Sequence, residues 1–338
     1  DFPLRQLTTA PASARAVRDW LLCQGPFAGK NNAGLRNNQA PLASVEVLIS
    51  GDAGAGEPVD TPNGARLKGA IEDWYARCNQ HADNVAFLYV CGHGVTLSSL
   101  QLLASDFGQS NQPNIWSRAL NLDNIRIGMR KCLAKRQFMF FDCCRGYTAN
   151  INGGNSEGIQ IFDQLLASPD IRHYVAMYST LEGSQAFGKV DQPSLFTTAL
   201  LDALMGYGST RVSGGWYVTN RMLEKAMHDI MRFDASVTVN MQLVEGNSAG
   251  DATLHELSTP PLVRTRVHCE PSLHMNDVTF DLTRPPDAFS HPGLNGPFNQ
   301  DISPGEWRIS MQHAQPHLSQ EDIPVITPPA FEKIFRVQ

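Results

Sequence analysis

The residues whose types suggest chemistry are a histidine and a cysteine, each following an apolar run. His93 stands between Gly92 and Gly94, directly after "VAFLYVC", and Cys144 follows "QFMFFDC" and precedes Arg-Gly. A cysteine attacks well only as its thiolate, so a nucleophilic cysteine needs an imidazole that takes its proton. The two residues therefore predict a Cys–His pair for nucleophilic catalysis, provided that the fold brings them together.

Each of these two residues also has an ordinary structural explanation. A histidine between glycines is typical of a turn, and a cysteine at the end of an apolar run is typical of a core residue. The combination favours chemistry, because functional groups in open α/β sheets gather at the carboxyl ends of the strands. Two parallel strands joined by a crossover helix would bring His93 and Cys144 to the same edge.

The cysteine at position 143 raises the question of which thiol is the nucleophile. Side chains alternate between the faces of a strand, so Asp142 and Cys144 share one face and Cys143 points to the other. Cys143 is then expected to be a packing residue. Redox chemistry at the two adjacent cysteines is an alternative, but vicinal cysteines rarely form a relaxed disulfide, and this alternative leaves His93 unexplained.

The elements that must position these residues alternate between helix and strand. Apolar residues at helical spacing predict helices at about 10–21, 67–78, 122–132, 194–206 and 220–232, and apolar runs predict strands at 45–50, 85–91, 137–142, 174–180 and 236–244. Such alternation, with nearly continuous apolar strands, indicates a mostly parallel sheet flanked by helices. We assign this α/β domain to residues 1–258.

The chain changes character near residue 258. Residues 262–338 show no helical stripe, are rich in proline and glycine, and contain the short pieces "VTFDL", "WRISM", "IPVIT" and "KIFRV". This pattern predicts a small all-β, sandwich-like and antiparallel accessory domain. It carries no catalytic candidate, so we expect it to serve docking, regulation or solubility.

The composition excludes several classes of function. Of the 338 residues, 42% are apolar and 18% are charged, which is typical of a soluble globular protein, and the net charge of −6 argues against nucleic-acid binding. The sequence has no apolar run near the roughly 18 residues that a membrane helix needs. Seven scattered cysteines without a CxxC pair favour reduced thiols in a cytoplasmic protein. We expect no metal, because no CxxC pair occurs, and no cofactor, because the glycine-rich "GDAGAGEP" lacks the Gly-Lys of a phosphate loop.

The two motifs together resemble those of caspase-fold cysteine peptidases (clan CD), the group of caspases, metacaspases and their bacterial relatives. The matching segments are the apolar runs into Gly92-His93-Gly94 and into Asp142-Cys143-Cys144-Arg145-Gly146. The histidine precedes Cys144 by 51 residues, close to the spacing of about 50 in caspases. Weaker similarity in "LLASDFG", "YSTLEGSQAF" and "SLFTTALLDAL" extends the resemblance to about residues 7–245.

The resemblance implies a cysteine endopeptidase with a Cys144–His93 dyad. His93 would act as the base and later protonate the leaving amine, and the backbone N–H groups of Gly94 and Cys144 would form the oxyanion hole. Asp142 matches the acidic residue with which metacaspases hold an arginine or lysine before the cut, and a carboxylate can pair with arginine bidentately. A cap of a turn is its alternative. Ser179 and Glu182 resemble the cleft-lining segment of the family, with plain loop residues as their alternative.

The sequence departs from the family at three places. Caspases have a glutamine where Asp142 stands, and metacaspases have a second aspartate in the first helix, where Ser13 stands here. The family fold also opens with an apolar strand, for which the residues before the first predicted helix leave no room; we expect trimming or processing to explain this.

The resemblance also suggests a biological setting. It implies a bacterial-type protein with a protein or peptide substrate, a place in a proteolytic defence or cell-death cascade, and a regulatory partner at the C-terminal domain. The rival hypothesis is a catalytically inactive caspase-like scaffold that binds a protein partner. The presence of both Cys144 and His93 argues against it, because scaffolds tend to lose one of the two residues.

Overall fold

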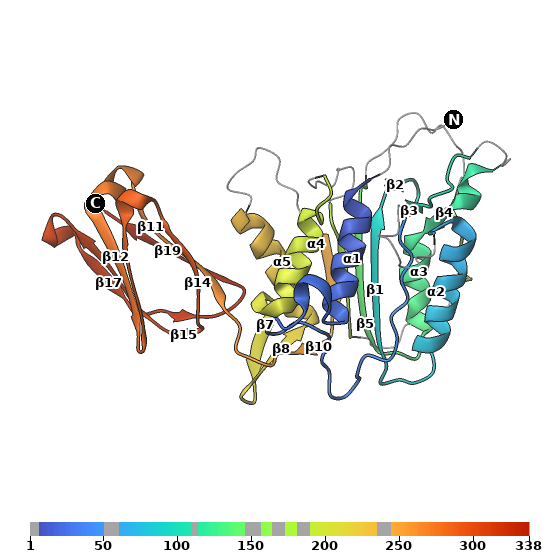
Figure 1. The fold of residues 1–338 in the computed structure, drawn as a ribbon, viewed down its shortest axis with the longest axis horizontal. Coiled ribbons are helices and arrows are strands. Elements are labelled where there is room, and N and C mark those ends of the chain that lie inside the picture. The colour runs from blue at the N-terminus through green and yellow to red at the C-terminus, as the bar shows by residue number, and fades with distance from the viewer. Residues whose placement is uncertain are drawn as a thin grey trace.

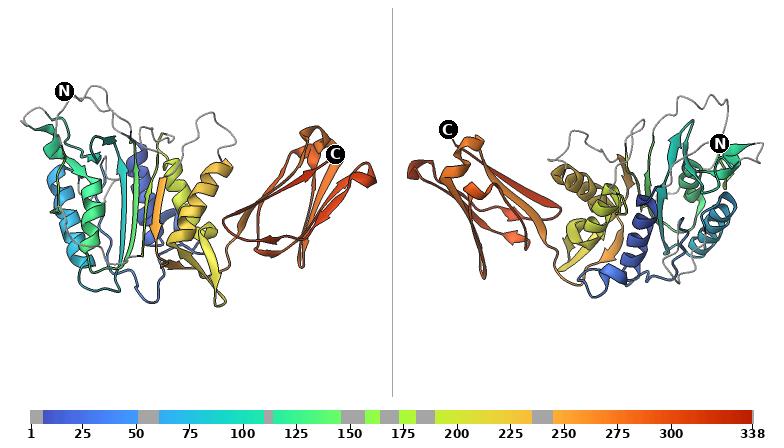
Figure 2. Two further views of the ribbon diagram at one scale, coloured as in Figure 1. Left: turned by 180° about the vertical axis from the view of Figure 1, so that it is seen from behind. Right: turned by 45° about the horizontal axis from the view of Figure 1, so that its top comes forward.

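The computed structural model describes residues 7–50, 61–109, 114–145, 157–163, 173–180, 190–234 and 245–337. The chain forms an α/β unit and a C-terminal β unit that lie side by side (Figure 1). Figure 2 shows the same two bodies from behind, joined near the end of the α/β unit at which β7 and β8 lie.

The main sheet of the α/β unit has four strands among the described residues. Its order is β1 (Val85–Gly92), β5 (Arg136–Cys143), β6 (His173–Tyr178) and β9 (Glu245–Ala249). The first three strands are parallel and β9 runs antiparallel to β6. The mostly parallel sheet that the sequence predicts is therefore confirmed.

Helices cover both faces of this sheet (Figure 1). One face carries α1 (Thr9–Leu21), α4 (Leu195–Asp202) and α5 (Asn220–Asp234), and the other carries α2 (Gly64–Cys78) and α3 (Leu122–Gly128). A short π-helical turn (Ala203–Tyr207) continues α4, and 3-10 turns follow α1 (Gly25–Phe27) and α3 (Met129–Lys131). The five helices that the sequence predicts are all present.

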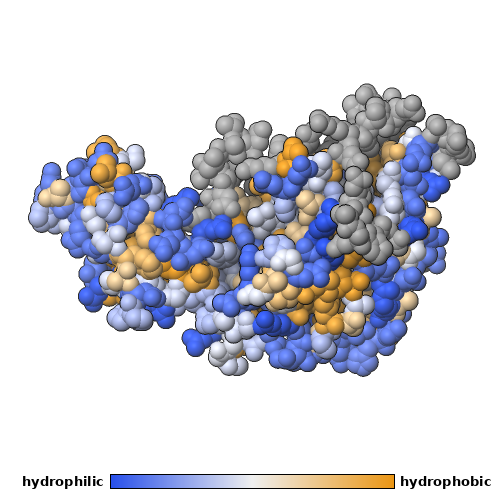
Figure 3. Space-filling model, viewed as in Figure 1, coloured by the Kyte–Doolittle hydropathy of each residue, from blue (hydrophilic) through white to orange (hydrophobic). Residues whose placement is uncertain are grey.

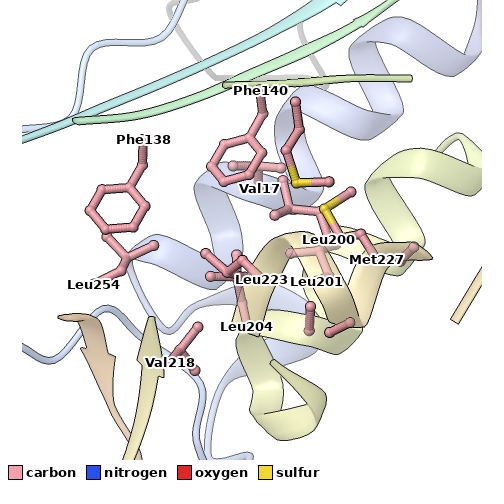
Figure 4. Close-up of a cluster of buried hydrophobic side chains, with 14 of the residues drawn as sticks. Val17, Phe138, Phe140, Leu200, Leu201, Leu204, Val218, Leu223, Met227 and Leu254 are labelled. Carbon is pink, nitrogen blue, oxygen red and sulfur yellow. The ribbon is translucent and has the colours of Figure 1, made fainter. Parts of the chain in front are cut away.

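Strand β5 divides the interior into two hydrophobic cores. Phe138 and Phe140 pack with Leu200 of α4 and Leu223 of α5 (Figure 4). The alternate residues of β5, Met139 and Phe141, belong to the second core with side chains of α2 and α3. The period-two alternation of the strand thus decides which helices each side chain of β5 meets.

Polar residues cap three of the helices. The side chains of Asn63, Asn121 and Ser194 accept hydrogen bonds from the backbone N–H of Arg66, Asn124 and Thr197 at the starts of α2, α3 and α4. Such caps satisfy one of the N–H groups that the first turn of a helix leaves unpaired. They fix where these helices begin, and the Ser194 hydroxyl also contacts Asp142.

Two small sheets were missed by the sequence analysis. One contains β2 (Gly94–Thr96), β3 (Leu100–Leu103) and β4 (Ala119–Asn121), and a 3-10 turn (Ile115–Arg118) directly precedes β4. The other contains β7 (Ser209–Val212), β8 (Gly215–Thr219) and β10 (Thr253–Glu256). The β7–β8 turn holds Ser213 at φ 47° and Gly214 at φ 89°. Two left-handed residues are typical of a two-residue hairpin, but a serine in the first position hides this signal.

One predicted strand is wrong and another is not described. No strand forms over residues 45–50, where only Leu48 makes a β-bridge. Its β-branched residues favour an extended backbone, but a strand also needs hydrogen bonds to a partner over several residues. The strand predicted at 236–244 lies outside the described residues.

The C-terminal unit is all-β, with a core of its own. Its strands are β11 (Val263–Glu270), β12 (Val278–Arg284), β13 (Asp287–Pro292), β14 (Phe298–Ile302), β15 (Gly305–Glu306), β16 (Arg308–His313), β17 (Gln320–Asp322), β18 (Val325–Ile326) and β19 (Ala330–Arg336), with 3-10 turns at Ser272–Asp277, Gly293–Asn295 and Pro316–Leu318. They form the sheets β14-β11-β19, β13-β12-β16-β17 and β15-β18. Phe280, Trp307 and Phe335 lie in the core between them.

One pairing in this unit corrects the expectation of a purely antiparallel domain. Strands β11 and β19 pair in parallel. The chain reaches β19 after β16 and β17, which belong to the other large sheet, and such a crossover permits the parallel direction that a hairpin cannot give.

Polar contacts connect the two units at the end of α4. Arg264 of β11 pairs with Asp202 at 3.3 Å, and its guanidinium lies 5.1 Å from the centre of the Tyr207 ring. The Tyr207 hydroxyl donates a hydrogen bond to Asp301 of the C-terminal unit at 2.5 Å. The C-terminal unit is therefore held through the helix that also lines the first core.

A buried histidine fixes the loop that follows α1. His255 is fully buried, accepts a hydrogen bond from the Arg36 N–H at Nδ1 (3.0 Å), and lies 3.1 Å from the Asn32 carbonyl oxygen at Nε2. Because Nδ1 is the acceptor, the neutral ring carries its proton on Nε2 and donates it to Asn32. Burial lowers the pKa of His255 to about 4.

This lowered pKa predicts a loss of stability in acid. Between pH 6.5 and about 4 the unfolded chain binds a proton that the folded chain excludes, so the free energy of unfolding falls with pH, by about 2 kcal/mol at pH 5. Urea unfolding at pH 7.5 and pH 5 should show this loss in the unmodified protein and in the His81→Gln control, whose histidine is exposed, and a smaller loss in His255→Gln. Equal losses in all three proteins would refute the assignment.

Candidate active site

The pairing of β1 with β5 places His93 and Cys144 at one edge of the sheet. In the parallel register, Cys91 stands opposite Asp142 and Gly92 opposite Cys143. His93 and Cys144 are the next residues along each chain, and both are half-buried. The two strands therefore deliver an imidazole and a thiol to neighbouring positions at their carboxyl ends.

Gly94 brings the backbone after the histidine against the cysteine loop. A Cβ atom on Gly94 would overlap the carbonyl oxygen of Cys144 and would lie 2.9 Å from Cβ and 3.0 Å from Sγ of Cys143. Only glycine allows this approach of the two backbones. The His93 carbonyl accepts a hydrogen bond from Leu103 N–H at 2.9 Å, which ties the loop to β3.

The two adjacent cysteines lie in different surroundings. Cys143 is 1% exposed and belongs to the second core, and burial raises the pKa of its thiol far above the usual value. A thiol held neutral in an apolar core is a poor nucleophile. Cys144 is the more accessible of the pair, because it lies beyond the end of β5.

Asp142 points to the opposite face from Cys143, toward α4. Its carboxyl oxygen Oδ2 accepts hydrogen bonds from the hydroxyls of Ser194, Thr197 (2.7 Å) and Tyr89 (3.1 Å), and a weak one from the Cys91 thiol (3.5 Å). Burial raises the pKa of Asp142, and these hydrogen bonds oppose that rise. The donors are side chains of β1 and α4, so the structure does not favour the alternative of a turn cap.

Ser13 of α1 borders the same polar group. It is fully buried, its hydroxyl oxygen accepts a hydrogen bond from Ser194 N–H at 2.9 Å, and it lies within hydrogen-bond reach of the Cys91 thiol. The position at which metacaspases carry a second aspartate is thus beside Asp142 here as well, but it holds a neutral hydroxyl. Tyr89, Ser194 and Thr197 were missed by the sequence analysis.

Arg145 ties the end of β5 to its neighbours. It forms an ion pair with Glu245 of β9, donates to the Thr180 carbonyl at 3.4 Å, and lies 4.7 Å from the centre of the Tyr178 ring. Its side chain is 11% exposed, so this pair is better shielded from water than a surface pair. The residue after Cys144 thereby fixes the loop to β6 and β9.

The remaining predicted site residues have mixed positions. Ser179 is fully buried, and its hydroxyl donates to the Cys143 carbonyl at 3.1 Å, beneath the strand end; a contact with substrate stays a prediction. Glu182 lies outside the described residues. Asp106, in the segment "LLASDFG" that resembles the family, accepts a hydrogen bond from Gly64 N–H at 2.9 Å and pairs with Arg118 at 2.9 Å, so it holds its loop to the start of α2.

The described residues contain one group with metal-ligand composition, in the C-terminal unit. Ligand atoms of His274, Asp277 and His313 lie within 4.8 Å of one another. However, Nδ1 of His313 accepts a hydrogen bond from Gln315 N–H, so the neutral ring carries its proton on Nε2, which faces Nδ1 of His274 at 3.3 Å. A metal on Nε2 would displace that proton, so we assign the two rings to a hydrogen-bonded pair. Nearby in the sequence, His268 faces Glu332 at 3.4 Å.

A cavity of about 560 Å³ lies apart from the strand ends, between α1, α4 and the segment before β11. Phe27, Leu201 and Leu262 contribute apolar walls, and Lys30 and Asp202 contribute charges. Apolar side chains gather on this face of the α/β unit around the lower end of α1 (Figure 3).

Among the described residues, no helix is both long and apolar enough to span a membrane.

The close approach at Gly94 predicts that Gly94→Ala destabilises the protein. The added methyl group meets backbone atoms that cannot move without shifting β5, which should lower the free energy of unfolding by about 1–3 kcal/mol. Gly69→Ala in α2 is the matched control: nothing lies within 4 Å of the new methyl group, and alanine favours the helix by up to about 1 kcal/mol. Urea unfolding measures both changes, and a neutral Gly94→Ala variant contradicts the packing described here.

Comparison with known proteins identifies the family. The family model described as the caspase domain (Peptidase_C14) matches residues 46–237, more than half of the chain. Among solved structures, caspase-1 from Spodoptera frugiperda is 17% identical, with 55% of this chain and 67% of that chain covered and a TM-score of 0.34. The search of curated proteins returned no match. The family that the paired motifs suggest is confirmed by the domain match: this chain belongs to the caspase-domain family.

Proposed function

We propose that this protein is a cysteine endopeptidase that uses Cys144 as nucleophile and His93 as general base. The observation that carries the proposal is the register of β1 and β5, which pairs Gly92 with Cys143, the residues directly before His93 and Cys144. Caspase-domain proteins are typically cysteine peptidases, so membership of the family supports the same activity.

The chemistry follows from the groups at this edge. His93 takes the proton of the Cys144 thiol, and the thiolate attacks the carbonyl carbon of the scissile peptide bond. The backbone N–H groups of Gly94 and Cys144 stabilise the resulting oxyanion. His93 then gives its proton to the departing amine, and a water molecule, deprotonated by the same imidazole, hydrolyses the thioester and restores the thiol.

Asp142 supports a preference for a basic residue before the cut. It lies two residues before Cys144 in β5, on the strand face opposite to that of Cys143. Burial raises the pKa of its carboxyl group and the surrounding hydroxyls oppose that rise, so a cation bound beside it would favour the ionised form further. The other members of this polar group are neutral. A single negative charge at this place suits a lysine or arginine side chain of the substrate.

The dyad predicts a clear order among cysteine variants. Cys144→Ala and His93→Ala should each lower kcat/KM on fluorogenic peptides with a basic residue before the cut by about 10³-fold or more, because each removes a reacting group. Cys143→Ala is the matched control, since its buried thiol takes no part in the reaction, and should keep kcat/KM within a few-fold. A large loss of kcat/KM in Cys143→Ala, with Cys144→Ala still active, would contradict the assignment of the nucleophile.

The same assay separates the rival explanations. No cleavage of any peptide by the unmodified protein would favour the inactive scaffold, and equal dependence on both cysteines would favour redox chemistry. The defence or cell-death cascade, the cytoplasmic location, the bacterial origin and a regulatory partner at the C-terminal unit stay predictions of the family resemblance.

A further inference from the structure

We propose that Asp142 recognises the basic side chain of the substrate through one oxygen only, Oδ1, so that the pocket accepts lysine at least as well as arginine. The proposal rests on the proposed function and adds to it the residues that set the choice between the two basic side chains. It assigns this role to Ser194 and Thr197, as positioning residues that occupy Oδ2, and to Tyr89 as the donor that can replace Thr197.

Hydroxyl donors fill the oxygen Oδ2 of Asp142. The hydroxyls of Ser194 and Thr197 both reach this oxygen, and the Ser194 hydroxyl oxygen in turn accepts the N–H of Thr197 at 2.9 Å. Each hydroxyl has a single proton to donate, and a carboxylate oxygen has two lone pairs. Two hydroxyl donors therefore fill the lone pairs of Oδ2.

Tyr89 is a reserve donor for the same oxygen. Its hydroxyl lies 2.5 Å from the Thr197 hydroxyl oxygen and 3.1 Å from Oδ2. With the Thr197 proton directed at Oδ2, the Tyr89 proton goes to the Thr197 oxygen. If Thr197 lost its hydroxyl, Tyr89 would still reach Oδ2 and replace the missing donor.

The other carboxyl oxygen, Oδ1, has different surroundings. Among the residues that the structure describes, the hydrogen bonds of Asp142 all engage Oδ2 and none engages Oδ1. Ser13, which stands where a second carboxylate would help, is neutral. Asp142 thus offers an incoming cation a single carboxylate oxygen, Oδ1.

A single oxygen changes the balance between arginine and lysine. The guanidinium group gains its advantage by placing two parallel N–H groups on the two oxygens of a carboxylate. A lysine ammonium is a compact charge that needs only one of them. With Oδ2 filled, arginine loses its second hydrogen bond to the anion, which is worth about tenfold in affinity.

The test frees Oδ2 without changing the shape of the pocket. Tyr89→Phe and Thr197→Val each remove one hydroxyl and keep the volume. Only the double variant removes both hydroxyls, which leaves Oδ2 with the Ser194 hydroxyl and the weak Cys91 thiol donor at 3.5 Å. Ser194 is left unchanged because it also caps α4. Tyr174→Phe with Thr210→Val is the matched control, since the same two changes then lie on β6 and β7, away from Asp142.

The measurement is the affinity of acetylated tripeptide amides that end in Lys or Arg, by isothermal titration at pH 8.5 with the Cys144→Ala protein as background. We expect the lysine peptide to bind at least as tightly as the arginine peptide, and the ratio to move toward arginine by about tenfold in the Tyr89→Phe/Thr197→Val variant. Each single variant and the control should leave the ratio within about twofold. In active protein, the ratio of kcat/KM for the two substrates should follow the same order.

The outcomes separate this proposal from the proposed function. The proposal that only Oδ1 binds the cation is overturned if the protein with Tyr89 and Thr197 unchanged binds the arginine peptide tenfold more tightly than the lysine peptide. It is also overturned if the double variant leaves the ratio of the two affinities unchanged. Neither result affects the Cys144–His93 dyad. Binding of neither peptide overturns the proposal as well, together with the basic preference. Loss of activity in Cys143→Ala but not in Cys144→Ala overturns the dyad. The ratio of lysine-peptide to arginine-peptide affinity still tests the role of Asp142 in that case.

Discussion

The parallel pairing of β1 with β5 is the constraint on which the rest of the structure depends. It brings two segments that are distant in the chain into contact over eight residues and ends just before His93 and Cys144. Because side chains alternate along a strand, a shift of one residue would exchange the faces of Asp142 and Cys143. The buried apolar side chains of β5 exclude this shift, since it would move Phe138 and Phe140 into the other core.

The same alternation separates the tasks of three consecutive residues. Asp142 meets hydroxyls of α4, Cys143 is enclosed by the second core, and Cys144 lies beyond the strand. Adjacent thiols that look equivalent in the sequence thereby acquire different chemistry, since one is kept neutral by burial. Arg145, the residue after Cys144, pairs with Glu245 of β9, so the chain just beyond β5 is tied to the far strand of the sheet.

Much of this arrangement could be predicted from the sequence, because the helices and central strands have strong apolar periodicity and polar caps. The failures have physical causes. The segment at 45–50 has strand-like residues but makes a bridge at Leu48 alone, and β9, with the sequence "EGNSA", has no apolar signal at all. Tyr89 reads as a core residue of β1, and Ser194 reads as a helix cap, although both also serve Asp142. Such a second role depends on which side chain lies opposite in the fold, so the sequence alone does not indicate it.

Helix α4 has a consequence that reaches across the molecule. Ser194 at its start touches Asp142, and Asp202 at its end pairs with Arg264 of the C-terminal unit, about 12 Å away along the helix axis. A helix of about two turns bends little. A displacement of the C-terminal unit at Asp202 would therefore shift the start of α4 as well, and with it the Ser194 hydroxyl that contacts Asp142.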